Sequence, residues 1–358
     1  MLKFFKSPIF LLLLLSFFIL VLVFNFFLSD KDWDSTYWRI ASGINHQQVT
    51  VADFATTKMN RVLSSPVLVF LPLFLSSFFG GFDFGNFNFS LLMMNVVFYF
   101  LTVIFFYLLV QLIYQSSRVA LIAAVIFFTN YAMVSFGLNA GADMAGWAFM
   151  VMTSYWAVKY FKEPQKTKFY FLAILTASLG MFFKEYAILG MLTLGTLIIF
   201  LKERWSKKII KLSGAGLMFL VIPGLYHLFY YFKFGYTYLA FYDSAARLDN
   251  YDLILLIKVL GSLFTIGWFY FLFGLYQEYR NRDPRRTEIL LGLLPASLAF
   301  FGWPLFTQRV AFVLVPLLAM ISGFGLSKIK SNLLIALLLI IYAIPQFFMP
   351  EILLMVNL

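Results

Sequence analysis

Long apolar runs recur along almost the entire chain and are separated by short polar connections. A transmembrane helix needs about 20 consecutive, mostly apolar residues, and most of the runs approach or exceed that length. The pattern predicts about eleven membrane-spanning helices. They are expected at 8–28, 90–113, 117–136, 143–161, 168–183, 186–201, 209–232, 252–276, 288–306, 308–327 and 331–348.

One apolar stretch, 64–79, is too short for a full crossing and is interrupted by Pro66 and Pro72. We expect it to form a re-entrant or membrane-surface segment. It belongs to the connection 29–89, which with 233–251 is one of the two long connections. Long connections tend to carry function. The first apolar run is long for a signal peptide and lacks a small-residue cleavage pattern, so we expect a membrane anchor.

The composition agrees with a membrane protein. Of the 358 residues, 62% are hydrophobic and 12% are charged, whereas a soluble domain has about 25% charged residues. A soluble globule of this size could not bury so much apolar surface. The fold class is therefore all-α integral membrane, with residues 1–358 as a single transmembrane domain. The absence of cysteine excludes a disulfide framework, a cysteine-ligated zinc and a thiol nucleophile.

The formal net charge of +11 divides unevenly between the two sides of the membrane. With the N-terminus in the cytoplasm, the cytoplasmic connections hold 18 Lys and Arg against 5 acids, a net of +13. The outer side holds 9 basic against 11 acidic residues, a net of −2. This division satisfies the positive-inside rule. The basic charge thus reports orientation in a plasma membrane, and no nucleic-acid partner is expected.

An acidic stretch follows the first predicted span. Asp30, Asp32 and Asp34 alternate with other residues and lead into an amphipathic segment that contains Tyr37. A carboxylate at the membrane surface can act as a general base, and three close acids could also hold Mg²⁺ or Mn²⁺. The alternative is structural, because Asp34 or Ser35 would serve well as a helix N-cap.

Isolated cations lie at the outer ends of predicted helices. They are Arg61, Lys184, Arg247 and Arg309. The planar guanidinium fork suits a phosphate group, although such a residue can equally be a snorkelling anchor. Two further outer acids accompany the cations, Asp143 at a helix start and Glu185 beside Lys184. A charged pair so close to the apolar zone needs a partner or a water-filled cavity.

An acid together with cations at the membrane surface suits transfer from a lipid-linked phosphate. The acid would take a proton from an acceptor hydroxyl, and the cations would stabilise the leaving phosphate. Other chemistry has less support. His46 and His227 belong to no HExxH pattern, and neither a dinucleotide-binding GxGxxG nor a GxxxxGK[ST] phosphate loop is present.

The order of these motifs resembles the GT-C superfamily of polytopic membrane glycosyltransferases, which use polyprenyl-phosphate-linked sugars and include mannosyl- and arabinosyltransferases. The resemblance covers most of the chain. It rests on Asp34-Ser35-Thr36-Tyr37, Arg61-Val62-Leu63-Ser64-Ser65-Pro66, Asp143, Lys184-Glu185, and Arg309 ahead of Pro316. It implies a GT-C-like fold with membrane-surface helices in the first outer loop.

The resemblance also implies roles for the motif residues. The first-loop acid of the family is catalytic, which favours Asp34 with Asp32 as the competitor. The donor would be a polyprenyl-phosphate sugar, and the acceptor a lipid, a glycan or a protein. Arg61, Lys184, Arg309 and Arg247 are candidates for binding the donor phosphate, and Tyr37, Asp143 and Glu185 for orienting the substrate. Transfer would invert the anomeric configuration.

Two other classes of function compete with this interpretation. One is a transporter or flippase for a lipid-linked solute, for which paired repeats or a mid-membrane carboxylate would be typical. No repeat of the acidic motif is visible in the sequence. The other is a non-catalytic protein that keeps a GT-C-like scaffold. Solute accumulation in vesicles would identify the first, and transfer activity of the purified chain would exclude the second.

Overall fold

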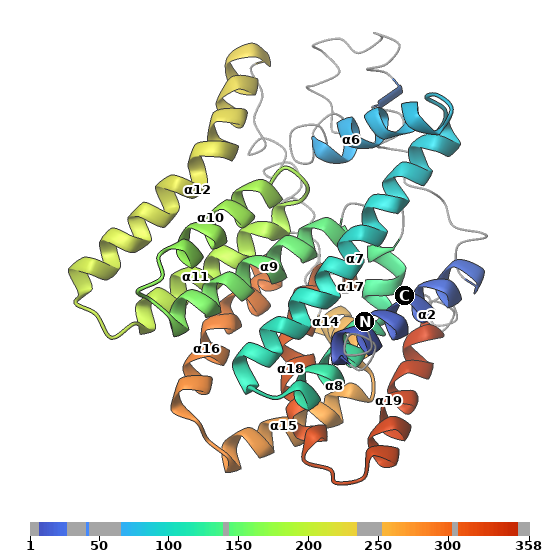
Figure 1. Ribbon diagram of the computed structural model, residues 1–358, viewed down its shortest axis with the longest axis vertical. Coiled ribbons are helices and arrows are strands. Elements are labelled where there is room, and N and C mark those ends of the chain that lie inside the picture. The colour runs from blue at the N-terminus through green and yellow to red at the C-terminus, as the bar shows by residue number, and fades with distance from the viewer. Residues whose placement is uncertain are drawn as a thin grey trace.

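The computed structural model describes residues 7–26, 41–42, 66–138, 143–234, 253–302 and 307–349. Every regular element in these ranges is helical, which confirms the all-α prediction for the described part of the chain. Figure 1 shows the helices gathered into a bundle, with α12 leaning away from it at one side and α6 lying across the end of α7.

The helices have the following bounds. They are α2 (Pro8–Phe26), α6 (Val67–Ser76), α7 (Phe84–Tyr114), α8 (Ser117–Phe128), α9 (Asp143–Lys162), α10 (Lys168–Gly180), α11 (Leu189–Phe200), α12 (Trp205–Phe234), α14 (Leu253–Phe264), α15 (Gly267–Arg280), α16 (Pro284–Leu298), α17 (Gln308–Ala311), α18 (Val315–Ser327) and α19 (Asn332–Phe347). Shorter turns link them, namely η1 (Ser77–Phe79), η2 (Met133–Gly137), η3 (Glu185–Ile188), η4 (Ala299–Gly302) and η5 (Phe312–Leu314).

Three helical segments of the described chain are long and apolar enough to cross a membrane. They are Phe84–Tyr114, Trp205–Phe229 and Gln308–Ser327. A fourth candidate is the bent pair Leu253–Phe264 and Gly267–Arg280. The other apolar helices are shorter because turns or breaks interrupt the runs. The number of crossings, about eleven by hydropathy, therefore stays a prediction.

The centre of the bundle is α18, whose residues 315–326 are all buried. Small residues allow its neighbours to approach closely. A Cβ built on Gly323 would lie 2.6 Å from the Ala123 Cβ on α8. On the opposite side, a Cβ on Gly274 of α15 would lie 2.1 Å from the Ile321 carbonyl oxygen. Only glycine fits at that crossing.

The predicted span 117–136 is interrupted at Asn130, where α8 has ended and the chain continues into the π-helical turn η2. Buried polar groups replace the lost helical hydrogen bonds, as a membrane interior requires. The Asn130 side chain donates to the Leu263 carbonyl at 2.7 Å and to the Tyr342 hydroxyl at 3.2 Å. The Tyr131 amide donates to the Gln346 side chain at 2.9 Å.

The predicted span 252–276 is also not one straight helix, since α14 and α15 meet at 81°. Thr265, at the break, has φ 45°, in the left-handed region. The Gln346 side chain donates to the Thr265 hydroxyl at 3.0 Å. The Gln346 side chain is thereby hydrogen-bonded to both breaks and links them to α19.

The short stretch predicted not to cross forms α6 and η1. The ten residues of α6 extend about 15 Å, roughly half of the hydrocarbon thickness. Phe70, Phe74, Phe78 and Phe79 are exposed, and α6 lies across the N-terminal end of α7 (Figure 1). This arrangement is typical of a membrane-surface helix, as the sequence predicts for the first outer loop.

Candidate active site

Asp143 and Arg309 form an ion pair that joins two distant parts of the chain. Asp143 is the first residue of α9, where a carboxylate interacts favourably with the helix dipole. Its Oδ2 accepts from the Nε of Arg309, which lies in the first turn of α17. The Asp143 side chain is 2% exposed and that of Arg309 is 35% exposed. A ligand can therefore reach the Arg309 guanidinium from its exposed side, while the buried Asp143 carboxylate binds the guanidinium on its other side.

Lys184 and Glu185 form a second ion pair where the chain reverses between α10 and α11. Lys184 is extended, with φ −165°, and its amide donates to the Gly180 carbonyl at 2.9 Å. Its Nζ lies 3.3 Å from Glu185 Oε1, and the two side chains are 8% and 15% exposed. The pair satisfies the requirement that charges at this depth have a partner.

Gly146 brings the two ion pairs close together. It lies one helical turn after Asp143, on the same face of α9. A Cβ built on Gly146 would lie 2.7 Å from the Lys184 Cβ and 3.2 Å from the Tyr186 Cβ. The segment 184–186 therefore packs directly on the first turns of α9. The missing side chain at position 146 makes this close approach feasible.

Trp147 packs against aromatic residues beside the ion pairs. Its ring centroid lies 4.0 Å from that of Phe312 in η5 and 6.2 Å from that of Tyr186 in η3. Trp147 is fully buried and ties together the three segments that carry the charges. No motif in the sequence marks this residue as functional. Its position four residues after Asp143, on the same helical face, is the signal that could have indicated it.

Three buried polar atoms around the ion pairs have no hydrogen-bond partner within the described part of the chain. They are Asp143 Oδ1, Glu185 Oε2 and Trp147 Nε1. Buried polar groups normally have a partner. Two acceptors and one donor beside two cations would suit a ligand that carries both hydroxyl groups and a negative charge.

One part of the first long connection, at the start of α6, lies next to this cluster. The amide of Val67, directly after Pro66, donates to the Phe182 carbonyl at 3.2 Å. Phe182 precedes Lys184 by two residues. The start of α6 therefore lies beside the segment that carries Lys184.

Five of the predicted site residues lie outside the described residues: Asp32, Asp34, Tyr37, Arg61 and Arg247. The other four, Asp143, Lys184, Glu185 and Arg309, are brought together, each cation beside one acid. Within the described ranges, no group of three or more His, Cys, Asp or Glu side chains could hold a metal ion. The Mg²⁺ or Mn²⁺ option rests on the acids near residue 32, which those ranges do not include.

A family model described as dolichyl-phosphate-mannose-protein mannosyltransferase matches residues 70–227. The fold also matches solved structures of the Archaeoglobus fulgidus oligosaccharyltransferase. In one, which is tethered to an acceptor peptide containing the NVT sequon, the TM-score is 0.61 at 14% identity, covering 98% of this chain and 55% of that one. The chain therefore shares the fold of this oligosaccharyltransferase.

A second solved structure, the archaeal oligosaccharyltransferase AglB with an inhibitory peptide and a dolichol-phosphate, matches this chain with a TM-score of 0.57 at 14% identity. The match covers 80% of this chain and 47% of that one. The chain thus spans about half the length of these structures. No curated protein matches its sequence. The family model includes Asp143, Lys184 and Glu185, whereas Arg309 lies beyond it.

Proposed function

We propose that the chain transfers a sugar from a polyprenyl-phosphate donor to an acceptor hydroxyl on the outer face of the membrane. The observation that carries this proposal is that two ion pairs lie together at the first turns of α9. One buried carboxylate oxygen of each pair has no hydrogen-bond partner within the described part of the chain. The match of residues 70–227 to the mannosyltransferase family model and the fold shared with the archaeal oligosaccharyltransferase support it. The dolichol-phosphate bound to the related archaeal enzyme supports a lipid-linked donor.

The two cations are assigned to the donor phosphate. Arg309 is the more accessible, and its fork matches two phosphate oxygens. Lys184 supplies a second positive charge from segment 184–186, which packs on the first turns of α9. Asp143 and Glu185 orient the cations, and their remaining oxygens accept hydrogen bonds from sugar hydroxyls. Arg61 and Arg247, from the two long connections, are further phosphate-binding candidates.

The transfer itself is a single displacement. Asp34 removes the proton of the acceptor hydroxyl, with Asp32 as the competing base and Tyr37 orienting the substrate. The acceptor oxygen bonds to the anomeric carbon as the bond from that carbon to the phosphate oxygen breaks. The electron pair leaves with the polyprenyl phosphate, where the cations stabilise the added charge. Attack opposite the leaving group inverts the anomeric configuration.

The test is a transfer assay with the purified full chain in lipid nanodiscs. Polyprenyl-phosphate mannose and arabinose are offered with a lipid, a glycan or a peptide acceptor, and products are identified by mass spectrometry. We expect a glycosylated acceptor of inverted configuration and released polyprenyl phosphate. A parallel sample with EDTA shows whether Mg²⁺ or Mn²⁺ is needed. Movement of the intact donor across vesicles without sugar transfer would contradict the proposal and favour a flippase.

The orientation of the chain can be tested directly because the sequence has no cysteine. Gln165 lies in the basic connection after α9, and Ser244 lies in the long connection 233–251. We expect a membrane-impermeant maleimide to label Ser244→Cys in intact cells and to label Gln165→Cys only after permeabilisation. The reverse pattern would place the candidate active site in the cytoplasm and overturn the proposed orientation.

Replacing Gly146 by alanine is expected to lower transfer about 10- to 100-fold. The added Cβ would clash with Lys184 and Tyr186, so segment 184–186 must shift, and misplacement of about 1 Å can cost 100-fold in rate. Overpacking should also cost about 1–3 kcal/mol of stability. Gly216→Ala on α12 is the control, since a Cβ there meets nothing within 4 Å. Equal activity of the two variants would exclude this positioning role.

A further inference from the structure

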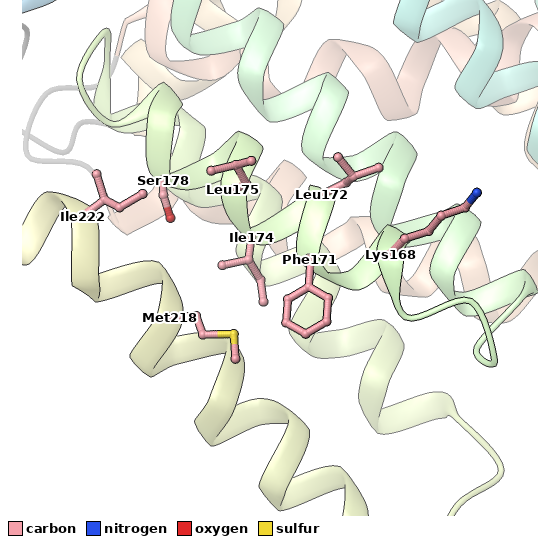
Figure 2. Close-up of a pocket in the computed structure, with 8 residues that line it drawn as sticks. All are labelled: Lys168, Phe171, Leu172, Ile174, Leu175, Ser178, Met218 and Ile222. Carbon is pink, nitrogen blue, oxygen red and sulfur yellow. The ribbon is translucent and has the colours of Figure 1, made fainter.

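We propose that the groove between α10 and α12 binds an anionic phospholipid of the cytoplasmic leaflet, with its phosphate at Lys168 and an acyl chain along the groove. The groove is distinct from the candidate active site. Figure 2 shows Lys168 at one end of it and Ser178 and Ile222 at the other.

The groove has a defined shape and an apolar lining. It encloses about 530 Å³, within the range of roughly 300–1,000 Å³ that is usual for ligand sites. Phe171, Leu175 and Ser178 follow one face of α10 at helical spacing, and Met218 and Ile222 face them from α12. Phe171, Leu175 and Met218 are 49%, 46% and 44% exposed, so an acyl chain would cover substantial apolar surface.

Two hydrogen bonds fix the spacing of the helices along the groove. The Tyr170 hydroxyl donates to the Lys211 carbonyl at 2.7 Å near the Lys168 end. The Ser178 hydroxyl donates to the Phe219 carbonyl at 3.2 Å near the other end. The separation of α10 and α12 is therefore fixed before a lipid binds, and the groove between them is preformed.

The length of the groove corresponds to one leaflet. From Lys168 to Ser178 is ten residues along α10, or about 15 Å at the helical rise. The hydrocarbon core of a bilayer is about 30 Å thick. A lipid with its phosphate at Lys168 would thus reach the bilayer midplane with its chain against Ser178 and Ile222.

Charge identifies the headgroup. Lys168 is exposed at the start of α10, and no carboxylate of the described residues lies within ion-pair distance of its ammonium group. It belongs to the connection 159–168, which the charge distribution places in the cytoplasm, and basic residues attract the anionic lipids of that leaflet. Lys184 lies beyond the opposite end of α10, about 18 Å or more along the helix from Lys168. One lipid phosphate cannot contact both lysines.

The test is native mass spectrometry of the purified full chain with phosphatidylglycerol and phosphatidylcholine of identical acyl chains. We expect one phosphatidylglycerol to be retained about fivefold more strongly than phosphatidylcholine, the preference that one basic residue near the surface supplies. Lys168→Gln should abolish this preference. Lys207→Gln, at an exposed position in the first turn of α12 outside the groove, should keep it.

A second pair of variants tests the groove itself. Met218→Trp should fill it and weaken binding of both lipids, whereas Leu217→Trp, on the exposed surface next to it, should not. Melting temperatures verify that all variants fold. The proposal is overturned if Lys168→Gln retains the preference, if Met218→Trp binds as the unchanged chain does, or if polyprenyl phosphate displaces phosphatidylglycerol. None of these outcomes depends on sugar transfer.

Discussion

Replacing Asp34 by asparagine is expected to lower sugar transfer about 10²- to 10⁴-fold, the contribution usual for general base catalysis. Asparagine has nearly the same shape as aspartate and can replace it as an N-cap, but it cannot accept the acceptor's proton. The transfer assay with a saturating donor measures the loss in kcat. The affinity for the donor should change little, because the phosphate contacts are assigned to other residues.

Two further variants show whether the effect belongs to Asp34. Asp32→Asn should retain most of the activity, and a loss there with activity kept in Asp34→Asn would assign the base to Asp32. Asp83→Asn is the matched control, because the Asp83 side chain accepts from the Asn86 amide at 2.7 Å and caps α7. It should leave transfer unchanged. Full activity of both Asp32→Asn and Asp34→Asn would refute a first-loop base.

Local features of the candidate site could be predicted from the sequence, because each has a local cause. Asp143 follows a small-residue stretch and precedes an apolar run, the pattern of a helix start, and α9 begins there. Lys184 and Glu185 interrupt an apolar stretch, which indicates a reversal, and α10 ends shortly before them. Pro66 and Pro72 mark a short apolar segment, and α6 is a helix of ten residues.

Helix breaks at Asn130 and Thr265 could not be predicted in this way. Both lie in apolar stretches, where a hydropathy average shows no interruption. What stabilises them is tertiary, because Asn130 needs the Leu263 carbonyl and Tyr342, and Thr265 needs Gln346. Each partner is far away in the sequence, and no spacing rule connects them.

The pairing of Asp143 with Arg309 is likewise a product of the fold. The two residues are separated by several helices, and only the fold brings the first turn of α17 to the start of α9. The sequence indicated both as outer charges at helix ends. It could not indicate that buried Asp143 forms an ion pair with Arg309. Because the two residues are paired, we expect the effects of substituting Asp143 and Arg309 to be coupled.

Replacing Arg309 by methionine is expected to lower transfer about 10²- to 10³-fold, the cost usual for removing one group that stabilises developing charge. It should also destabilise the protein, because Asp143 would remain as a buried carboxylate without its cation, a change that costs about 3–5 kcal/mol. The loss of activity is measured per folded molecule. The melting temperature in detergent reports the stability.

The double variant Arg309→Met with Asp143→Asn separates these two effects. Removing both charges should restore much of the stability, since the buried charge is no longer left alone, but transfer should stay low because the phosphate lacks its cation. Recovery of both would show that the pair is only structural. Arg286 and Glu278 form a matched ion pair away from the candidate site, at 2.9 Å with both side chains 13% exposed. Arg286→Met should lower the melting temperature without lowering transfer per folded molecule, so it isolates the role of Arg309 as a phosphate ligand.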